Sequence, residues 1–240
     1  MTEPVVSADN LTKSFSTGTP VLRGVSMAVQ PGEFRAIVGP SGSGKSTLLY
    51  CMSGLEAATT GRVSLLGRDP AALSRGALSQ LRRDHVGFVF QAYNLIPSLT
   101  ARENVALPAR LATRRVDDGA VDRALAHVGL TERASYRPSA LSGGQQQRVA
   151  IARVLALRPD VVFADEPTGA LDTRAGDQVL DLLGDVARDG RAVVMVTHDL
   201  RAAARADRVL VLRDGAVHRE LTGPSVDDVI AAVAHAEIEV

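Results

Sequence analysis

The stretch IVGPSGSGKSTLLYCMSG, Ile37 to Gly54, changes character twice within its length. It begins as a short apolar run, passes through a glycine-serine loop that holds one lysine, and continues with the spacing of an amphipathic helix. A strand, a glycine-rich loop and a helix in this order predict an α/β fold with an anion-binding loop at a strand end.

The loop GPSGSGKST, residues 39–47, fits the pattern G-x-x-x-x-G-K-[ST] of a phosphate-binding loop. Its glycines let successive backbone N–H groups converge on phosphate oxygens. We expect Lys45 to reach the β- and γ-phosphates of a nucleotide and Ser46 to bind Mg²⁺. The predicted nucleotide-binding residues here are Gly39, Pro40, Ser41, Gly42, Ser43, Gly44, Lys45, Ser46 and Thr47. The loop alone does not distinguish motors, kinases, GTPases and transporters.

The composition is that of a globular protein, with 240 residues, 45% hydrophobic and 22% charged. Lys plus Arg and Asp plus Glu number 27 each, so we expect no nucleic-acid partner. The single cysteine, Cys51, excludes an internal disulfide and is expected to be buried on the helix after the loop. No run approaches the about 20 apolar residues of a membrane span, and no signal-peptide pattern occurs, so we expect a cytoplasmic protein.

The rest of the chain alternates between strand and helix patterns, except in one long segment. We expect β runs on both sides of a Pro31-Gly32 turn, further strands near 61–67, 86–91, 160–166 and 191–199, and a hairpin over 208–221 about Asp214-Gly215. The runs VVFA and AVVMV are apolar without alternation, as in parallel strands covered on both faces. Helices are expected near 77–84, 174–188, 199–206 and in the last segment, 224–240.

From residue 92 to about 159 the strand pattern disappears, and helical patterns follow one another over 99–111, 116–130 and 143–159. We therefore predict one composite domain. It comprises an α/β core (residues 1–91 and 160–221), an inserted helical subdomain (92–159) and a C-terminal helix (222–240).

Polar residues follow several of the predicted strands. Asp165 ends VVFADE, residues 161–166, where its carboxylate can hold a metal-bound water, and the adjacent Glu166 can activate an attacking water. Gln91 and His198 end two other predicted strands. Gln91 is suited to contact a metal ion and a water, and His198 is suited to reach a γ-phosphate. Each also fits the polar end of an ordinary strand. Because ligands gather where parallel strands end, we predict that these side chains share one site.

A second helix start of the same kind occurs in LSGGQQQR, residues 141–148. Ser142 is a suitable N-cap, and the two glycines after it leave backbone N–H groups exposed at the positive end of the helix. The chain thus carries a second candidate anion-binding helix end, hereafter the signature turn (residues 141–145).

In order along nearly the whole chain, GPSGSGKST, FVFQ, LSGGQ, VVFADE, TGALD and VTHD resemble the ATP-binding subunit of ABC transporters. The resemblance implies a P-loop NTPase core with a mostly parallel sheet, an N-terminal antiparallel β portion and an inserted α-helical subdomain. It also implies a head-to-tail homodimer, in which each ATP is held between the phosphate loop of one copy and the signature turn of the other.

The resemblance also implies individual roles. Lys45 and Ser46 would bind phosphate and Mg²⁺, Gln91 and Asp165 would support the metal, Glu166 would be the catalytic base, and His198 would contact the γ-phosphate. The opposite ATP would be contacted by Ser142, Gly143, Gly144, Gln145 and Asp172, with Asp172 communicating across the dimer. The family commonly stacks adenine on a tyrosine after the first strand; here Phe15 keeps the aromatic face without the hydroxyl.

Within the family, FVFQAYNLIPSLTARENVALP and ADEPTGALD look like the lipoprotein-release, macrolide-export and cell-division branch. That likeness implies a transmembrane permease on a separate chain and a peripheral position on the inner face of the cell membrane. The patch that receives the permease would include Tyr93, Leu95, Ile96 and Leu99, although each fits packing of the helical insertion equally well.

Two other function classes stay open at this stage. A soluble nucleotide kinase would carry a similar phosphate loop but would have no use for the signature turn. An ATPase that serves DNA or the ribosome is disfavoured because the chain has no heptad run, no cysteine pairs and one ATPase unit. The transported substrate and the direction of transport do not follow from the sequence.

Overall fold

A computed structural model describes residues 3–15, 18–111 and 117–238. The strands are β1 (Val6–Ser14), β2 (Pro20–Val29), β3 (Phe34–Val38), β4 (Thr60–Leu65), β5 (Val86–Phe90), β6 (Val161–Asp165), β7 (Ala192–Val196), β8 (Arg208–Arg213) and β9 (Ala216–Thr222). The helices are α1 (Lys45–Met52), α2 (Arg75–His85), α3 (Ala101–Leu111), α4 (Asp118–His127), α5 (Gly143–Leu157), α6 (Thr173–Arg188), α7 (Leu200–Ala203) and α8 (Val226–Ile238). Short 3₁₀ turns cover Pro70–Ala72, Thr131–Arg133 and Pro138–Ala140.

The larger sheet has six strands in the order β5-β6-β7-β3-β8-β9. Its first five strands are parallel, and β9 returns antiparallel to β8. Along β6, Val161 and Phe163 pack into one buried cluster while Val162 and Ala164 pack into another. Both faces of this sheet are therefore covered, which confirms the meaning of the unbroken apolar runs.

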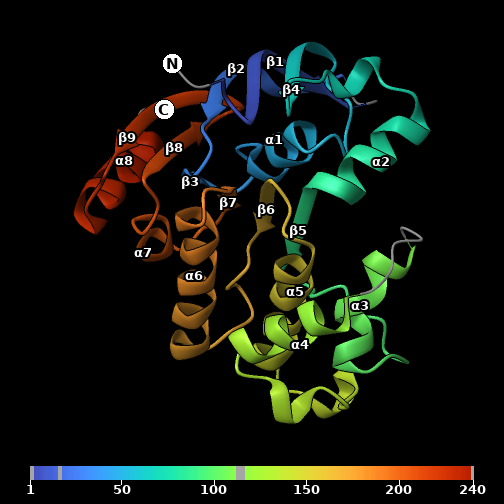
Figure 1. The fold of residues 1–240 in the computed structure, drawn as a ribbon. Coiled ribbons are helices and arrows are strands. Elements are labelled where there is room, and N and C mark those ends of the chain that lie inside the picture. The colour runs from blue at the N-terminus through green and yellow to red at the C-terminus, as the bar shows by residue number, and fades with distance from the viewer. Residues whose placement is uncertain (1–2, 16–17, 112–116, 239–240) are drawn as a thin grey trace.

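A smaller antiparallel sheet, in the order β2-β1-β4, covers α1 from the other side. Figure 1 shows α1 between this sheet at the top and the ends of β6 and β7 below it. Leu48, Leu49 and Met52 are fully buried there, and Cys51 is 2% exposed, as expected for a small core residue. The helix that follows the glycine loop is therefore fixed between two sheets.

Helices α5 to α8 cover the opposite face of the larger sheet, and α3 and α4 pack on α5 at the lower right of Figure 1. All of α3, α4 and α5 lie between β5 and β6 in the sequence, where helical patterns were expected. The exact subdomain boundaries at residues 92 and 159 stay predictions. No helix in the described ranges is long and apolar enough to cross a membrane.

Three local expectations can be compared with the structure. The β runs beside Pro31-Gly32 both form, but β2 and β3 belong to different sheets. The turn at Asp214-Gly215 is a hairpin turn with positive φ at both residues, 48° and 79°. The helix expected over 199–206 is wrong in length, because α7 stops at Ala203 and the N–H groups of Arg205 and Ala206 bond three residues back, in a 3₁₀ pattern.

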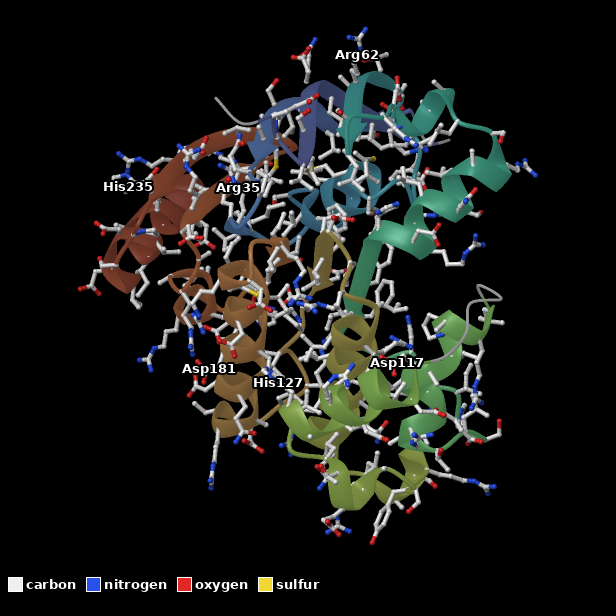
Figure 2. The ribbon with its side chains drawn as sticks, viewed as in Figure 1. Arg35, Arg62, Asp117, His127, Asp181 and His235 are labelled. Carbon is white, nitrogen blue, oxygen red and sulfur yellow. The ribbon has the colours of Figure 1, made fainter. Side chains whose placement is uncertain are left out.

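A buried ion pair joins the centre of the larger sheet to its edge. Arg35 on β3 is 1% exposed; its Nε lies 2.8 Å from Glu33 Oε1 and its Nη2 lies 2.9 Å from Glu220 Oε1 on β9. Figure 2 shows Arg35 within the body of the protein and Arg62 projecting from its outer surface.

We expect Arg35→Ala to lower the free energy of unfolding by about 3 kcal/mol, because it leaves the Glu33 carboxylate buried without its guanidinium. Urea denaturation followed by circular dichroism measures this change. Arg62→Ala, at an exposed position, is the matched control and should shift the stability by no more than about 0.5 kcal/mol. Equal midpoints for the two variants would contradict the assignment.

Candidate active site

The carboxyl ends of β3, β5, β6 and β7 meet at one edge of the larger sheet. The phosphate loop leaves β3 at this edge, and Gln91, Glu166 and the Thr197-His198 segment follow the other three strands. The expectation that these residues lie on one edge of a parallel sheet is therefore met by the geometry.

The phosphate loop needs glycine for steric reasons. Gly39 has φ 145°, and a Cβ placed on it would lie 2.0 Å from the Leu212 carbonyl oxygen of β8. Gly44 precedes α1 with φ 96° and provides no side-chain cap, so the first N–H groups of α1 stay available to an anion. Ser43 Oγ is buried and bonds to no described residue, which adds an unused polar group to the loop.

Lys45, the first residue of α1, folds back over the loop. Its Nζ donates to the carbonyl oxygens of Gly39 at 2.9 Å and Pro40 at 2.8 Å. Burial lowers the pKa of Lys45, while the charges of Glu166 and Asp165 oppose this shift. The ammonium group therefore stands between backbone carbonyls and two carboxylates, a position from which it can bind a phosphate.

Asp165, at the end of β6, receives hydrogen bonds from two hydroxyl groups of α1. Ser46 Oγ donates to Oδ1 at 3.0 Å, and the Tyr50 hydroxyl donates to Oδ2 at 2.6 Å. Burial, followed by the hydrogen bond to Asp165 and its charge, raises the pKa of Tyr50 to about 12. Tyr50 was not predicted from the sequence, although its spacing of four residues from Ser46 places the two on one helix face.

Glu166 adopts a left-handed backbone conformation with φ 48°, and its N–H donates to the Val196 carbonyl oxygen at 2.9 Å. The carboxylate is 17% exposed, and its Oε2 lies 2.9 Å from His198 Nδ1 and accepts the His198 backbone N–H at 3.3 Å. A non-glycine residue in this conformation is unfavourable by about 1 to 3 kcal/mol and persists where its surroundings hold it. The two contacts with His198 hold the Glu166 carboxylate on the side of the imidazole.

Gln91 lies against the loop that follows Glu166. A Cβ built on Gly169 would lie 2.9 Å from Gln91 Nε2, so the amide sits close to the Gly169 backbone. A role of Gln91 toward a metal ion stays a prediction.

The signature turn starts α5 with a complete capping box. The Gln145 N–H donates to Ser142 Oγ at 3.3 Å, and the Ser142 N–H donates to Gln145 Oε1 at 3.0 Å. Asp172 caps α6 beside it by accepting the Ala175 N–H at 2.9 Å. The glycines of the turn open on a hollow of about 450 Å³ lined by Ser142, Gly143, Gly144, Arg148, Ala170, Leu171, Asp172, Arg174, Ala175 and Gln178. Sequence reasoning thus found the helix end but not the capping function of Gln145 and Asp172.

Two residues of α5 that were not predicted from the sequence connect this helix to the rest of the site. Gln147, fully buried on α5, donates through Nε2 to the Pro167 carbonyl oxygen at 2.7 Å. Arg153, whose pKa is lowered by burial, donates to the carbonyl oxygens of Asn94 at 2.9 Å and Tyr93 at 3.3 Å. The three bonds hold the segments that follow two predicted site residues, Glu166 and Gln91.

The phosphate loop and the signature turn are separate features within one chain. Among the described residues, no hydrogen bond or ion pair joins residues 39–47 to residues 141–145, whereas Ser46, Asp165 and the Glu166–His198 pair follow one another along the sheet edge. The chain therefore presents two distinct surfaces suited to anions.

Phe15, the predicted adenine platform, lies after β1 and is 45% exposed. Lys13 Nζ lies 4.8 Å from the centre of its ring and pairs with the Glu56 carboxylate and the Ala57 carbonyl oxygen. The ring is open enough to stack on a base, but its role stays a prediction.

The residues of the predicted permease-binding patch differ in their exposure. Ile96 is 43% exposed, whereas Leu95 packs against the core. The fully buried Asn104 of α3 fixes the backbone around Ile96, accepting its N–H at 2.7 Å and donating to its carbonyl oxygen at 3.2 Å. Ile96 is therefore the side chain of this segment that is best placed to meet a partner.

The oxygen atoms next to the phosphate loop fit a magnesium ion better than a metal that is held by protein side chains alone. No cluster of three or more His, Cys, Asp or Glu side chains suited to a metal occurs in the described part of the chain. Mg²⁺ usually takes one or two protein oxygens together with waters and substrate phosphates. Ser46 Oγ and the Asp165 carboxylate, next to the phosphate loop, provide such a partial set.

Comparisons with known proteins agree with this geometry. The model of the family described as "ABC transporter" matches residues 22–169. The chain is 47% identical over 217 residues to the macrolide export ATP-binding/permease protein MacB of Marinobacter nauticus, and 48% identical over 222 residues to that of Bradyrhizobium diazoefficiens. These alignments cover 88% and 90% of this chain but 34% of each relative, so the chain spans about a third of the length of the curated relatives it matches.

One solved structure matches most of the chain. It is titled as a dimeric structure of a post-hydrolysis state of the ATP-binding cassette MJ0796, bound to ADP and Pi. The identity is 41%, the TM-score is 0.84, and the match covers 92% of this chain and 99% of the other. These findings confirm the predicted fold class and the likeness to the macrolide-export branch. By its family match, its sequence relatives and its fold, the chain belongs to the ABC transporter family.

Proposed function

We propose that this chain binds and hydrolyses ATP as a head-to-tail homodimer and transmits the resulting motion to a membrane permease. The observation that carries the proposal is the pair of separate anion-binding helix ends, of which one adjoins the Asp165 and Glu166 carboxylates and the other does not. Within one chain the two helix ends are separate features. In a head-to-tail pair, the signature turn of each copy would complete the nucleotide site of the other.

At the first half-site, the backbone N–H groups of the phosphate loop and Lys45 would bind the β- and γ-phosphates. Ser46 and Asp165 would hold Mg²⁺, which neutralises charge on the phosphates when bound. Glu166 would orient the attacking water and accept its proton, and His198, 2.9 Å from Glu166, would face the γ-phosphate. Phe15 would stack on adenine, and Gln91 would contact the metal and the water.

At the second half-site, the signature turn would close on the γ-phosphate held by the partner copy. The capping box rigidly orients the first turn of α5, and its hollow is open in the single chain. The dimeric arrangement of the 41% identical cassette MJ0796, bound to ADP and Pi, supports this geometry.

The membrane partner is inferred from the relatives. The MacB proteins carry the words "ATP-binding/permease" in their names, and this chain aligns with about a third of each. We infer that a transmembrane permease supplies the remaining function and holds this chain on the inner face of the cell membrane. No nucleic-acid partner is proposed, because the formal net charge is zero.

We expect Glu166→Gln to retain ATP and to accumulate as an ATP-bound dimer with hydrolysis reduced at least 100-fold, because the amide cannot accept the proton of the water. Phosphate release measures turnover, and size-exclusion chromatography with ATP measures the dimer. Lys45→Ala is the contrasting variant and should weaken ATP binding itself. Undiminished hydrolysis by Glu166→Gln would remove this residue from the role of base.

We expect Gly143→Asp to abolish ATP-dependent dimerisation and hydrolysis while the separate chain still binds ATP. A carboxylate at this position would face the γ-phosphate of the partner's nucleotide, and its Cβ would lie 2.8 Å from the Tyr93 hydroxyl oxygen. Gly143→Ala, which adds the Cβ alone, separates the steric effect from the charge and should keep more activity. Full hydrolysis by Gly143→Asp would instead favour a nucleotide kinase or another enzyme that works as a monomer.

We expect Ile96→Asp to reduce copurification with the permease at least ten-fold, because it places a charge in the apolar centre of the proposed contact. The permease is sought in the neighbouring reading frame, as a protein with transmembrane helices and a large extracytoplasmic domain. Ile230→Asp on α8 is the matched control, since Ile230 is 46% exposed and Ile96 is 43% exposed. Equal loss or equal retention in both variants would contradict this docking position.

A further inference from the structure

Tyr50 connects the phosphate-loop helix to the predicted metal-binding carboxylate. It lies four residues after Ser46 on α1, so both hydroxyl groups point from one face of the helix toward the end of β6. There Ser46 Oγ reaches Asp165 Oδ1 at 3.0 Å, and the Tyr50 hydroxyl reaches Oδ2 at 2.6 Å. The two bonds engage both oxygens of the carboxylate and fix the orientation of its plane.

We propose that Tyr50 is a positioning residue for magnesium, holding Asp165 through Oδ2 so that Oδ1 stays beside Ser46 in the orientation that binds the metal. The inference rests on the proposed ATPase function and deepens it. No contact between Tyr50 and the nucleotide is required, because the tyrosine acts through Asp165.

The hydrogen bond is well suited to this role because both of its ends are rigid. The Tyr50 carbonyl oxygen accepts the N–H groups of Leu55 at 2.9 Å and Glu56 at 3.0 Å and the Ser53 hydroxyl at 3.1 Å, which fixes the end of α1. Asp165 is the last residue of β6, a strand paired on both sides by β5 and β7. A short bond to a charged acceptor between two rigid elements restricts the acceptor to one orientation.

Groups that orient metal ligands have large effects on metal affinity. Removing a hydrogen-bond partner of a ligating group typically weakens metal binding 10- to 100-fold. A purely structural role predicts something different: Tyr50 would anchor α1 to β6, and its loss would change stability without a specific effect on the metal.

The test compares Tyr50→Phe with its parent in the Glu166→Gln protein, where ATP is not consumed. With the protein in excess over ATP, Mn²⁺ is titrated as the probe for Mg²⁺, and free Mn²⁺ is measured by electron paramagnetic resonance. We expect the Mn²⁺ dissociation constant of the ATP-bound protein to rise about ten-fold, while ATP affinity in EDTA changes less than two-fold. Tyr136→Phe, in the loop between the 3₁₀ turns at Thr131–Arg133 and Pro138–Ala140 and with its ring against Arg133, is the matched control and should change neither value.

The outcomes separate this inference from the function on which it rests. Unchanged Mn²⁺ affinity in a Tyr50→Phe protein that binds ATP would overturn the positioning role and leave the ATPase intact. Equal weakening of ATP binding in EDTA and of Mn²⁺ binding would assign Tyr50 to structure alone. A parent protein that binds ATP neither in EDTA nor with Mn²⁺ would overturn the proposed function and the inference together.

Discussion

The carbonyl oxygen of Leu212 occupies the space where a side chain at Gly39 would begin, and the rest of the structure depends on this close approach. It lets β8 lie beside β3 while the chain turns sharply out of β3 into the phosphate loop. The turn directs α1 back between the two sheets, where Leu48, Leu49 and Met52 are buried. Burial of one helix between two sheets therefore fixes the loop, the first turn of α1 and the Ser46 hydroxyl with respect to β6.

The charged groups at this edge of the sheet favour the binding of a phosphate. Lys45 is bonded to two loop carbonyl oxygens and lies within the field of Asp165 and Glu166. A phosphate bound here would replace these carbonyl contacts with a stronger ion pair. Glu166 pairs with His198, whereas Asp165 accepts hydrogen bonds from Ser46 and Tyr50, so the two adjacent acids have different partners.

The sequence predicted the features that depend on local patterns. Unbroken apolar runs identified β6 and β7, glycine spacing identified the loop, and Ser142 before two glycines identified the N-cap of α5. It did not separate β2 and β3 into different sheets, because β2 pairs with its sequence neighbour β1, whereas β3 pairs with β7 and β8, which are distant in sequence. Tyr50, Asn104, Gln147 and Arg153 escaped prediction for a similar reason: each acts by bonding to a residue or backbone group brought near by the fold.

Two side chains of α5, Gln147 and Arg153, join this helix to segments that follow predicted site residues. Gln147 ties it to the segment after Glu166, and Arg153 ties it to the segment after Gln91, where Tyr93 and Asn94 both have positive φ. This contact buries the charge of Arg153 against neutral carbonyl groups, and burial lowers the pKa of Arg153. The bonds go to carbonyl oxygens of two residues in the left-handed region, with φ 60° at Tyr93 and 49° at Asn94. Displacement of the exposed Ile96 by a partner would act on the same short segment. Because α5 is one continuous helix from Gly143 to Leu157, these bonds and the signature turn belong to one element.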